Sequence, residues 1–321
     1  METPTDIASA IYNEIIKADK ILFISHRNPD GDTIGSNIAL RIFADNIKKR
    51  TASACAQPLP PQFNFLPLSA TFITDLTLAD FDLLVCLDCG SAEQTVFLNQ
   101  KPPNFQTKII NIDHHPTNTL YGNINLVIKS AASTTEIIFQ LLRTWKAKIN
   151  PEIATCLLTG LYTDTGSFMH SNTGDQVLEI AGELITLGAK RDLIVKQLFK
   201  QSSPAKLLLL GKILENTNIT EKNVIISALR DEDIADCGAE QSEISGAINY
   251  LNCVKNTRFA ALLTEDGNGN IRGSLRTRDE SVNLSEIAKA LGGGGHKKAS
   301  GFTIQGRIKK EIHWKISKPK K

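Results

Sequence analysis

Residues 20–36 read KILFISHRNPDGDTIGS, and their pattern indicates the architecture of the first half of the chain. The first part of this stretch, Lys20–Ser25, is a short apolar run that predicts a buried β-strand. Pro29 and Gly31 then break the chain, and apolar residues return at helical spacing over Ile34–Ile47. A strand, a sharp turn and a helix in this order indicate the first unit of an alternating α/β fold.

The same alternation continues along the chain. Asp82–Leu87 and Lys108–Ile112 predict further strands, and Thr134–Lys146 and Glu152–Leu161 predict helices. Strands that alternate with helices form parallel sheets that are covered on both faces. We therefore expect an α/β N-terminal domain with a parallel sheet and helices on both faces.

The pattern changes in the last third of the chain. Asn223–Arg230, Thr257–Glu265 and Asn270–Arg276 predict strands, and Ser242–Val254 and Leu284–Leu291 predict helices. The turn between the last two strands resembles the start of a calcium loop but lacks its glycine and its final glutamate, so it predicts a hairpin. This part reads as a smaller α+β domain.

Three segments follow from these patterns. We expect a metal-binding catalytic domain over residues 1–187, a helical connector over 188–215 and a substrate-binding domain over 216–321. The hydrophobic fraction of 41% and the charged fraction of 22% are those of a globular protein. A net charge of +2 does not favour a protein that binds nucleic acid nonspecifically through its overall charge. No apolar run is long enough to span a membrane, so we expect a cytoplasmic protein.

Cys86 and Cys89 form a C-x-x-C motif. A zinc site would need a second pair, which the sequence lacks, and strand alternation predicts the two sulfurs on opposite faces. Buried, reduced thiols are therefore the preferred interpretation.

Aspartate and histidine concentrate in four stretches, each at or just after an apolar run. In open parallel sheets, ligands bind outside the carboxyl ends of the strands, so these side chains should meet at one edge. One aspartate alone would more often be a helix N-cap than a ligand, but four such stretches together favour a site. The residues are His26, Asp30, Asp32, Asp88, Asp113, His114, His115 and Asp164.

This mixture of carboxylates and imidazoles suits divalent cations such as Mn²⁺, with Mg²⁺ or Co²⁺ as alternatives. Even six of these eight side chains are more ligands than one cation takes from protein when water and substrate must also bind. Two cations that share a carboxylate fit the number better, and such pairs lie about 3.5–4 Å apart and activate a water molecule.

A second signal lies near the C-terminus, where Gly292–Gly295 precede His296. Asn283 and Glu286 form a capping box at the start of the helix that precedes this run, and one glycine is explained as the residue that ends the helix. A helix end does not explain four consecutive glycines. Backbone N–H groups of Gly293, Gly294 and Gly295 could approach an anion closely, and Arg276, with Ser274 before it on a strand, suits bidentate phosphate binding. The alternative is a flexible surface loop.

Together, the Asp113-His114-His115 triplet, the His26–Ser36 stretch and the glycine-rich His296 loop resemble the DHH phosphoesterases with a DHH-associated C-terminal domain, which include RecJ-like exonucleases. The resemblance covers nearly the whole chain and is greatest to the short oligoribonuclease and pAp-phosphatase type. Two arginines common in the family are absent here, because Ser91–Gln94 and Met169 stand in their places.

The resemblance implies a role for each site residue. His26 and Asp30 would hold one cation, with Asp88 bridging, and Asp32, His114 and Asp164 would hold the other. His115 would face the substrate, and Asp113 would orient a histidine. The substrate phosphate or nucleotide would be bound from the second domain, in a cleft between domains, by Arg276, Ser274, Gly293, Gly294, Gly295 and His296.

The activity implied is hydrolysis of short oligoribonucleotides (nanoRNA) or of 3′-phosphoadenosine 5′-phosphate (pAp), by attack of a metal-bridging hydroxide on phosphorus. A phosphodiesterase for c-di-AMP or pApA is the main alternative, and a pyrophosphate or polyphosphate hydrolase ranks lower. An inactive nucleic-acid-binding protein is disfavoured because none of the six ligands is lost. Relatives commonly dimerise, which leaves a homodimer open.

Overall fold

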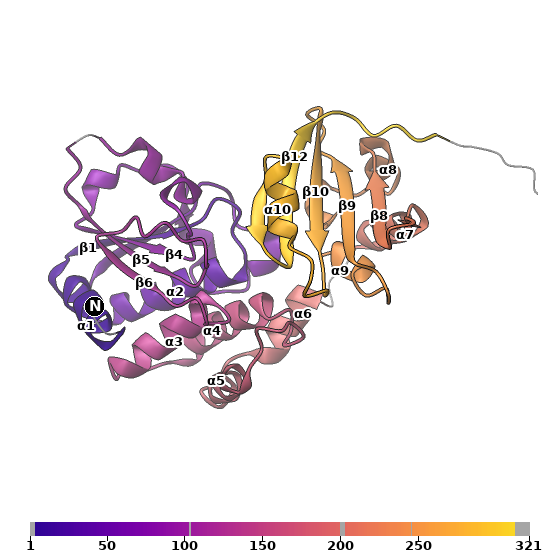
Figure 1. The fold of residues 1–321 in the computed structure, drawn as a ribbon. Coiled ribbons are helices and arrows are strands. Elements are labelled where there is room, and N and C mark those ends of the chain that lie inside the picture. The colour runs from indigo at the N-terminus through magenta and orange to yellow at the C-terminus, as the bar shows by residue number, and fades with distance from the viewer. Residues whose placement is uncertain (1–3, 103, 200–202, 245, 312–321) are drawn as a thin grey trace, which may run out of the picture. The chain divides into compact units, whose positions relative to one another are not determined.

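The structure is a computed structural model that describes residues 4–102, 104–199, 203–244 and 246–311 (Figure 1). The chain divides into two compact units, Met1–Gln201 and Ser202–Lys321. The three predicted segments, with their boundaries at 187/188 and 215/216, stay a prediction. Among the described residues, no helix combines the length and the apolar character needed to cross a bilayer.

The first unit is built on a six-stranded parallel sheet in the order β3-β2-β1-β4-β5-β6. β1 and β4 are almost entirely buried apolar runs, as expected for strands covered on both faces. The strand order reverses between β1 and β4, which is where open α/β sheets bind ligands. The strands are β1 (Lys20–Ser25), β2 (Arg50–Ala54), β3 (Phe72–Ile73), β4 (Leu83–Leu87), β5 (Lys108–Asp113) and β6 (Ile124–Val127).

The α-helices pack on one face of this sheet and short 3₁₀ helices on the other, which confirms the predicted α/β fold with a parallel sheet. The larger core lies between the sheet and these α-helices, which Figure 1 shows along one side of the sheet, and the second face is covered partly by two short 3₁₀ helices, Leu78–Asp80 and Phe97–Gln100. The α-helices of the unit are α1 (Pro4–Lys17), α2 (Gly31–Asn46), α3 (Thr134–Thr144), α4 (Pro151–Asp164), α5 (Asp175–Thr186) and α6 (Arg191–Phe199).

The prediction that Cys86 and Cys89 lie on opposite faces is wrong, because both side chains pack in the same buried cluster. The cause is Asp88 between them, whose φ of 61° is left-handed and ends the strand alternation. Both thiols are free and buried, and burial raises the pKa of Cys86 to about 12.

The second unit holds a mixed six-stranded sheet in the order β11-β12-β10-β9-β8-β7, in which only the β8–β9 pair is parallel. Helices on its two faces make it the α+β domain that was expected. Its elements are α7 (Pro204–Glu215), β7 (Asn218–Ile219), β8 (Val224–Leu229), α8 (Asp231–Asp236), α9 (Ile248–Leu251), β9 (Phe259–Glu265), β10 (Asn270–Arg276), α10 (Leu284–Ala290), β11 (Gly294–His296) and β12 (Ala299–Gln305).

Two local predictions in this unit have different outcomes. The hairpin between β9 and β10 is confirmed, with the Asp266 carboxylate accepting hydrogen bonds from the backbone N–H groups of Asn268 and Asn270. The prediction of a single helix over Ser242–Val254 is wrong, because a 3₁₀ turn and α9 lie on either side of Gly246, whose φ is 84°. A glycine in this conformation ends a helix rather than continuing it.

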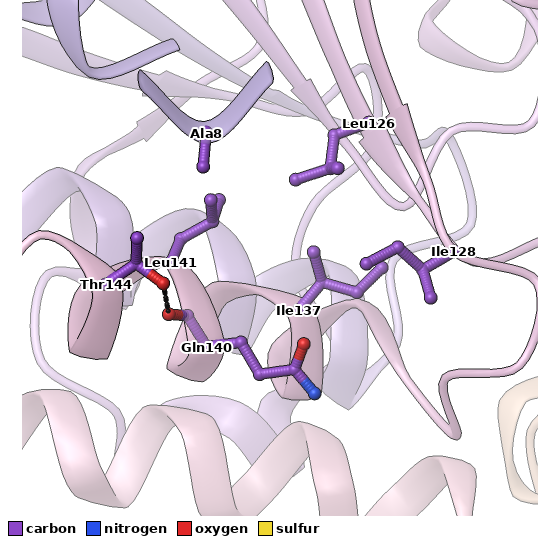
Figure 2. A pocket seen from close by; sticks show the side chains of 7 residues that line it. All are labelled: Ala8, Leu126, Ile128, Ile137, Gln140, Leu141 and Thr144. Atoms are coloured by element: carbon purple, nitrogen blue, oxygen red, sulfur yellow. Dashed lines mark hydrogen bonds between the residues drawn. The ribbon is translucent and has the colours of Figure 1, made fainter. Parts of the chain in front are cut away.

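A hollow of about 100 Å³ lies beside α3, between Ala8 of α1 and Leu126 of β6 (Figure 2). Apart from Gln140 and Thr144, its lining is aliphatic, and the Thr144 hydroxyl donates to the Gln140 carbonyl. The hollow includes none of the predicted site residues, and its two polar side chains carry no charge.

Candidate metal centre

The carboxyl ends of three neighbouring strands present the first of the predicted ligands. β4 pairs with β1 on one side and β5 on the other, and the register aligns Ser25 and Leu87, the last residues of β1 and β4, with Ile112, the residue before the end of β5. His26 and Asp88 directly follow their strands, and Asp113 ends β5. These side chains therefore leave the sheet at one edge, as the sequence predicted.

Two helix ends supply the remaining carboxylates. Asp30 is the N-cap of α2, and its Oδ1 accepts hydrogen bonds from the N–H groups of Asp32 and Thr33 at 3.0 and 3.1 Å. Asp32 lies in the first turn of α2 and is fully buried, and Asp164 is the last residue of α4. Asp30 thus has the ordinary capping role of an aspartate at this position and still lies beside the strand ends.

The six predicted ligands form two groups of three, in each of which the potential ligand atoms lie within 4.8 Å of one another. His26 Nε2 lies 3.4 Å from Asp88 Oδ2 and 3.8 Å from Asp30 Oδ1. His114 Nε2 lies 3.2 Å from Asp164 Oδ2 and 3.6 Å from Asp88 Oδ1. Asp88 is therefore the residue between the groups, with one oxygen towards each. The groups are His26, Asp30 and Asp88, and Asp32, His114 and Asp164.

These spacings fit ligands around a cation better than direct ion pairs. A direct hydrogen bond between an imidazole and a carboxylate is about 2.8 Å long. Adjacent ligands of an octahedral cation with bonds of about 2.1 Å lie about 3 Å apart. The separations of 3.2–3.8 Å are thus wide enough for a cation to lie between the atoms, and the donor set suits hard divalent cations.

The orientation of His114 also suits a ligand. Its Nδ1 lies 3.2 Å from the carbonyl oxygen of Ala131, so the tautomer that donates this hydrogen bond leaves the Nε2 lone pair directed at Asp88 and Asp164. A second hydrogen bond of this kind is the usual way in which a protein orients a ligating histidine.

The carboxylates of the cluster destabilise one another. Burial raises the pKa of Asp88, Asp164 and Asp32 above the usual carboxyl value, and for the first two the negative charges of neighbouring aspartates raise it further. Such a cluster gains from divalent cations, because they offset both the lost hydration and the mutual repulsion.

Without metal, the protein should become less stable as the pH rises. Asp88 and Asp164 hold protons in the folded state above the pH at which they lose them in the unfolded chain, so the folded state binds more protons and the free energy of unfolding falls with pH. His115 acts in the same direction, because its pKa is raised from 6.5 to about 9 and its contribution is lost as the pH passes that value.

Calorimetry from about pH 5 to about pH 9, with chelator and with Mn²⁺, checks this expectation. The melting temperature should fall with pH in chelator and should fall much less with Mn²⁺, since the cation competes with protons for the same oxygens. Asp113, whose pKa is lowered, titrates below this range and does not change the sign. A metal-free melting temperature that rises from the acidic to the alkaline end would contradict the argument.

Asp113 and His115 form a hydrogen-bonded pair beside the ligands, and His115 also groups with Asp88 and His114, its Nδ1 lying 3.5 Å from Asp88 Oδ1. The His115 Nδ1 lies 2.7 Å from Asp113 Oδ1, and the Asn118 side-chain amide donates to Asp113 Oδ2 at 2.6 Å. Burial of the His115 ring opposes protonation, but the hydrogen bond to Asp113 and the charge of Asp88 outweigh it and raise the pKa of His115 to about 9. Asp113 thus orients His115, while Asn118 holds Asp113.

The sequence analysis missed the groups that hold the carboxylates in place. Asn118 is one, and the N-terminus of α3, beginning at the N-cap Ser133, is another. The backbone N–H groups of Thr134 and Thr135 donate to the two oxygens of Asp32. The signal was present, since Ser133 to Glu136 has the S-x-x-E pattern of a capping box, which marks a helix start.

The residues predicted to bind substrate lie in the second unit. Cross-strand pairing aligns Arg276 of β10, Ala299 of β12 and His296 of β11 in one row. The neighbouring row holds Ser274, Gly301 and Gly294. Residues directly opposite one another point to the same face, so the predicted substrate residues of both rows share a face of the sheet.

The glycine run is an ordered hairpin rather than a flexible loop, since Gly294–His296 pair with β12. Three of its glycines now have a structural reason. Gly292 has a φ of 75°, and a Cβ on Gly293 or Gly295 would lie 2.1 or 2.6 Å from a carbonyl oxygen of β12. Gly294 has neither a positive φ nor an atom within 4 Å of its Cβ position, so within this run the argument that the glycines indicate an anion site applies to Gly294.

Comparison with known proteins covers both units. Residues 20–161 match the DHH family, N-terminal domain, and residues 221–314 match the DHHA1 domain. The bifunctional oligoribonuclease and PAP phosphatase NrnA of Thermus thermophilus is 32% identical over 299 residues, which are 91% of this chain and 87% of that protein. The protein of the same name from Bacillus subtilis is 28% identical over 89% of this chain and 90% of its own.

Among solved structures, an exopolyphosphatase-related protein from Bacteroides fragilis has a TM-score of 0.87 at 26% identity and covers 94% of this chain and 92% of its own. The likeness therefore extends over both units and over the strand ends that carry the ligand cluster. On these grounds the chain belongs to the DHH family of phosphoesterases and carries a DHHA1 domain in its C-terminal part.

Proposed function

We propose that this protein is a metal-dependent phosphoesterase that hydrolyses short oligoribonucleotides and pAp, using two divalent cations of which Mn²⁺ is the preferred one. The observation that carries the proposal is the pair of ligand groups with Asp88 between them. A pair of cations at such a site activates water and neutralises the charge of a phosphoryl group. The two relatives named above supply the substrate classes.

Both substrates require the same bond to break. In pAp, hydrolysis breaks the bond between phosphorus and the 3′-oxygen of the nucleoside. In an oligoribonucleotide, the bond between phosphorus and a 3′-oxygen is also the one that breaks when a 5′-nucleotide is released. One site therefore serves both reactions if it recognises a phosphoryl group on a 3′-oxygen.

His115 is the residue placed to assist that leaving oxygen. Asp113 holds its Nδ1, and this hydrogen bond favours the protonated ring. Its Nε2 is then the atom that can donate a hydrogen bond, or the proton itself, to a phosphoryl oxygen or to the leaving group. Asp113 acts by fixing the direction of the ring.

The second unit carries a surface of its own that suits a nucleotide. Helices α7, α8 and α9 pack over the half of the sheet face formed by β8 and β9. The half formed by β10, β12 and β11 carries Arg276 and His296, with only Ala299 between them in the row. At about 4.8 Å between strands, the two backbones lie about 10 Å apart. That span suits a phosphate bound at one side and a sugar or base at the other.

Arg276 is the residue on this surface that most needs a counter-ion. Its guanidinium donates to the neighbouring carbonyl of Leu275, and burial lowers its pKa. Among the described residues, no carboxylate lies within ion-pair distance of it. A half-buried cation without a counter-ion is costly, and a substrate phosphate would compensate that cost with two charged hydrogen bonds.

Arg276→Gln should therefore raise KM for pAp much more than it lowers kcat. A hydrogen bond to a charged group contributes about 1.5–3 kcal/mol, which corresponds to about 10- to 100-fold in KM. Arg272→Gln is the matched control, since Arg272 lies on the same strand but its side chain is 64% exposed and 3.9 Å from Asp266. Steady-state kinetics of both variants test the role, and an equal effect of the two would reject it.

One panel of substrates tests the proposed function. Purified protein with Mn²⁺ is offered pAp, a labelled RNA dinucleotide, a longer RNA, c-di-AMP and pyrophosphate. We expect hydrolysis of pAp and the dinucleotide with release of 5′-nucleotide. Cleavage of c-di-AMP alone or pyrophosphate alone would replace the proposed substrates, and no hydrolysis of any compound would reject the enzymatic activity.

A cytoplasmic location and a homodimeric state are part of the same proposal. Cell fractionation and analytical ultracentrifugation test them separately from the activity.

A further inference from the structure

Asp32 and Asp88, one from each ligand group, come from parts of the chain that share no element. Asp32 lies in α2, and Asp88 follows β4. For a pair of cations to lie about 3.5–4 Å apart, these two carboxylates must keep a fixed orientation relative to each other. The residues that could fix it are those that contact both.

Thr134, the first residue of α3, makes both contacts. Its backbone N–H donates to Asp32 Oδ2 at 2.6 Å, and its hydroxyl donates to Asp88 Oδ1 at 3.0 Å. The adjacent Thr135 N–H donates to Asp32 Oδ1 at 2.9 Å, so both oxygens of Asp32 are held by this helix end. Thr134 is fully buried, as is Asp32.

The position of Thr134 is itself fixed by the start of α3. The Ser133 hydroxyl accepts the N–H of Glu136, and the Glu136 carboxylate accepts the N–H of Ala132 at 2.7 Å. These hydrogen bonds fix the backbone at the start of the helix. Thr134 is therefore held in the orientation in which it contacts both aspartates. The positive end of the helix dipole also favours the negative charge of Asp32.

We infer that Thr134 is a positioning residue for the metal centre, which orients Asp88 relative to Asp32 through its hydroxyl and its backbone N–H. This inference rests on the proposed two-cation site. The hydroxyl occupies one lone pair of Asp88 Oδ1 and so limits the directions from which that oxygen can bind a cation. Removing it leaves a buried carboxylate oxygen without its donor and free to rotate.

The test compares Thr134→Val, which removes the hydroxyl at nearly constant volume, with Thr134→Ser, which keeps it. Thr159→Val is the matched control, because Thr159 is equally buried in the same unit but its hydroxyl donates only to the Thr155 carbonyl in its own helix. The readout is calorimetric titration of metal-free protein with Mn²⁺, with circular dichroism of each metal-free variant as the measure of folding.

We expect Thr134→Val to bind Mn²⁺ about 10- to 100-fold more weakly, the usual loss when a group that orients a metal ligand is removed. Thr134→Ser and Thr159→Val should bind as the wild type does. Equal binding by Thr134→Val, or an equal loss in Thr159→Val, would overturn the inference. If Thr134→Val does not fold, Thr134→Ala, which lacks the hydroxyl and adds no bulk, is judged by the same criteria.

The wild-type titration separates this inference from the proposal on which it rests. A wild-type protein that binds no Mn²⁺ overturns both the metal centre and the role of Thr134. A wild type that binds Mn²⁺ while Thr134→Val binds equally well overturns the role of Thr134 alone.

Discussion

Asp88→Asn should yield a folded protein that is more stable than the wild type without metal and is nearly inactive. Asp88 has a φ of 61°, and asparagine is one of the few residues that adopt this conformation at little cost. The backbone N–H can still donate to the Ile112 carbonyl, and the amide oxygen can still accept from the Thr134 hydroxyl. The substitution therefore removes a charge with little change of shape.

The gain in stability follows from electrostatics. Burial raises the pKa of Asp88, and the charges of Asp32 and Asp30 raise it further, so the ionised side chain destabilises the metal-free fold at neutral pH. The loss of activity follows from coordination, because the two ligand groups lose the anionic oxygens between them. We expect turnover to fall by about 10³-fold, as when a main source of transition-state charge stabilisation is removed.

Three measurements check these expectations: the melting temperature in chelator, the titration with Mn²⁺, and the rate of pAp hydrolysis. Asp82→Asn is the control, since Asp82 accepts backbone hydrogen bonds from Lys20 and Asp19, and these lower its pKa. Its loss should slightly destabilise the protein and leave turnover unchanged. Near-normal turnover in folded, metal-loaded Asp88→Asn would show that Asp88 does not join the two groups.

The sequence predicts the convergence of His26 and Asp88 because both follow strongly apolar runs. Such runs predict central strands, and the carboxyl ends of parallel strands share one edge. By contrast, the strand Arg50–Ala54 carries the sequence RTASA, in which no apolar pattern marks a strand. It forms because β1 offers it a paired edge, which is a tertiary effect.

The left-handed conformation of Asp88 and the donors around the carboxylates could not be predicted in the same way. Aspartate adopts a positive φ only where the surrounding fold imposes it, so neither its conformation nor the shared face of Cys86 and Cys89 is visible locally. The capping pattern at Ser133 predicts the start of a helix, but only the packing of α3 against α2 directs its N–H groups at Asp32.

The packing of α2 against α4 depends on Gly35, and Gly35→Ala should both destabilise the first unit and weaken its metal site. A Cβ on Gly35 of α2 would lie 2.4 Å from the Cys156 carbonyl oxygen of α4, and a backbone atom cannot rotate away as a side chain can. The helices must separate, at a cost of about 1–3 kcal/mol for overpacking, which exceeds the gain of about 1 kcal/mol in helix propensity. Separation also moves Asp32 of α2 away from Asp164 of α4, with which it shares a ligand group.

Gly182→Ala is the control, because Gly182 is inside α5 and a Cβ there meets no atom within 4 Å. It should raise the free energy of unfolding by about 1 kcal/mol through helix propensity alone and leave Mn²⁺ binding unchanged. Chemical denaturation and Mn²⁺ titration of both variants separate the two effects. If Gly35→Ala were as stable as Gly182→Ala and bound Mn²⁺ normally, the close crossing of α2 and α4 would not be what holds Asp32 and Asp164 together.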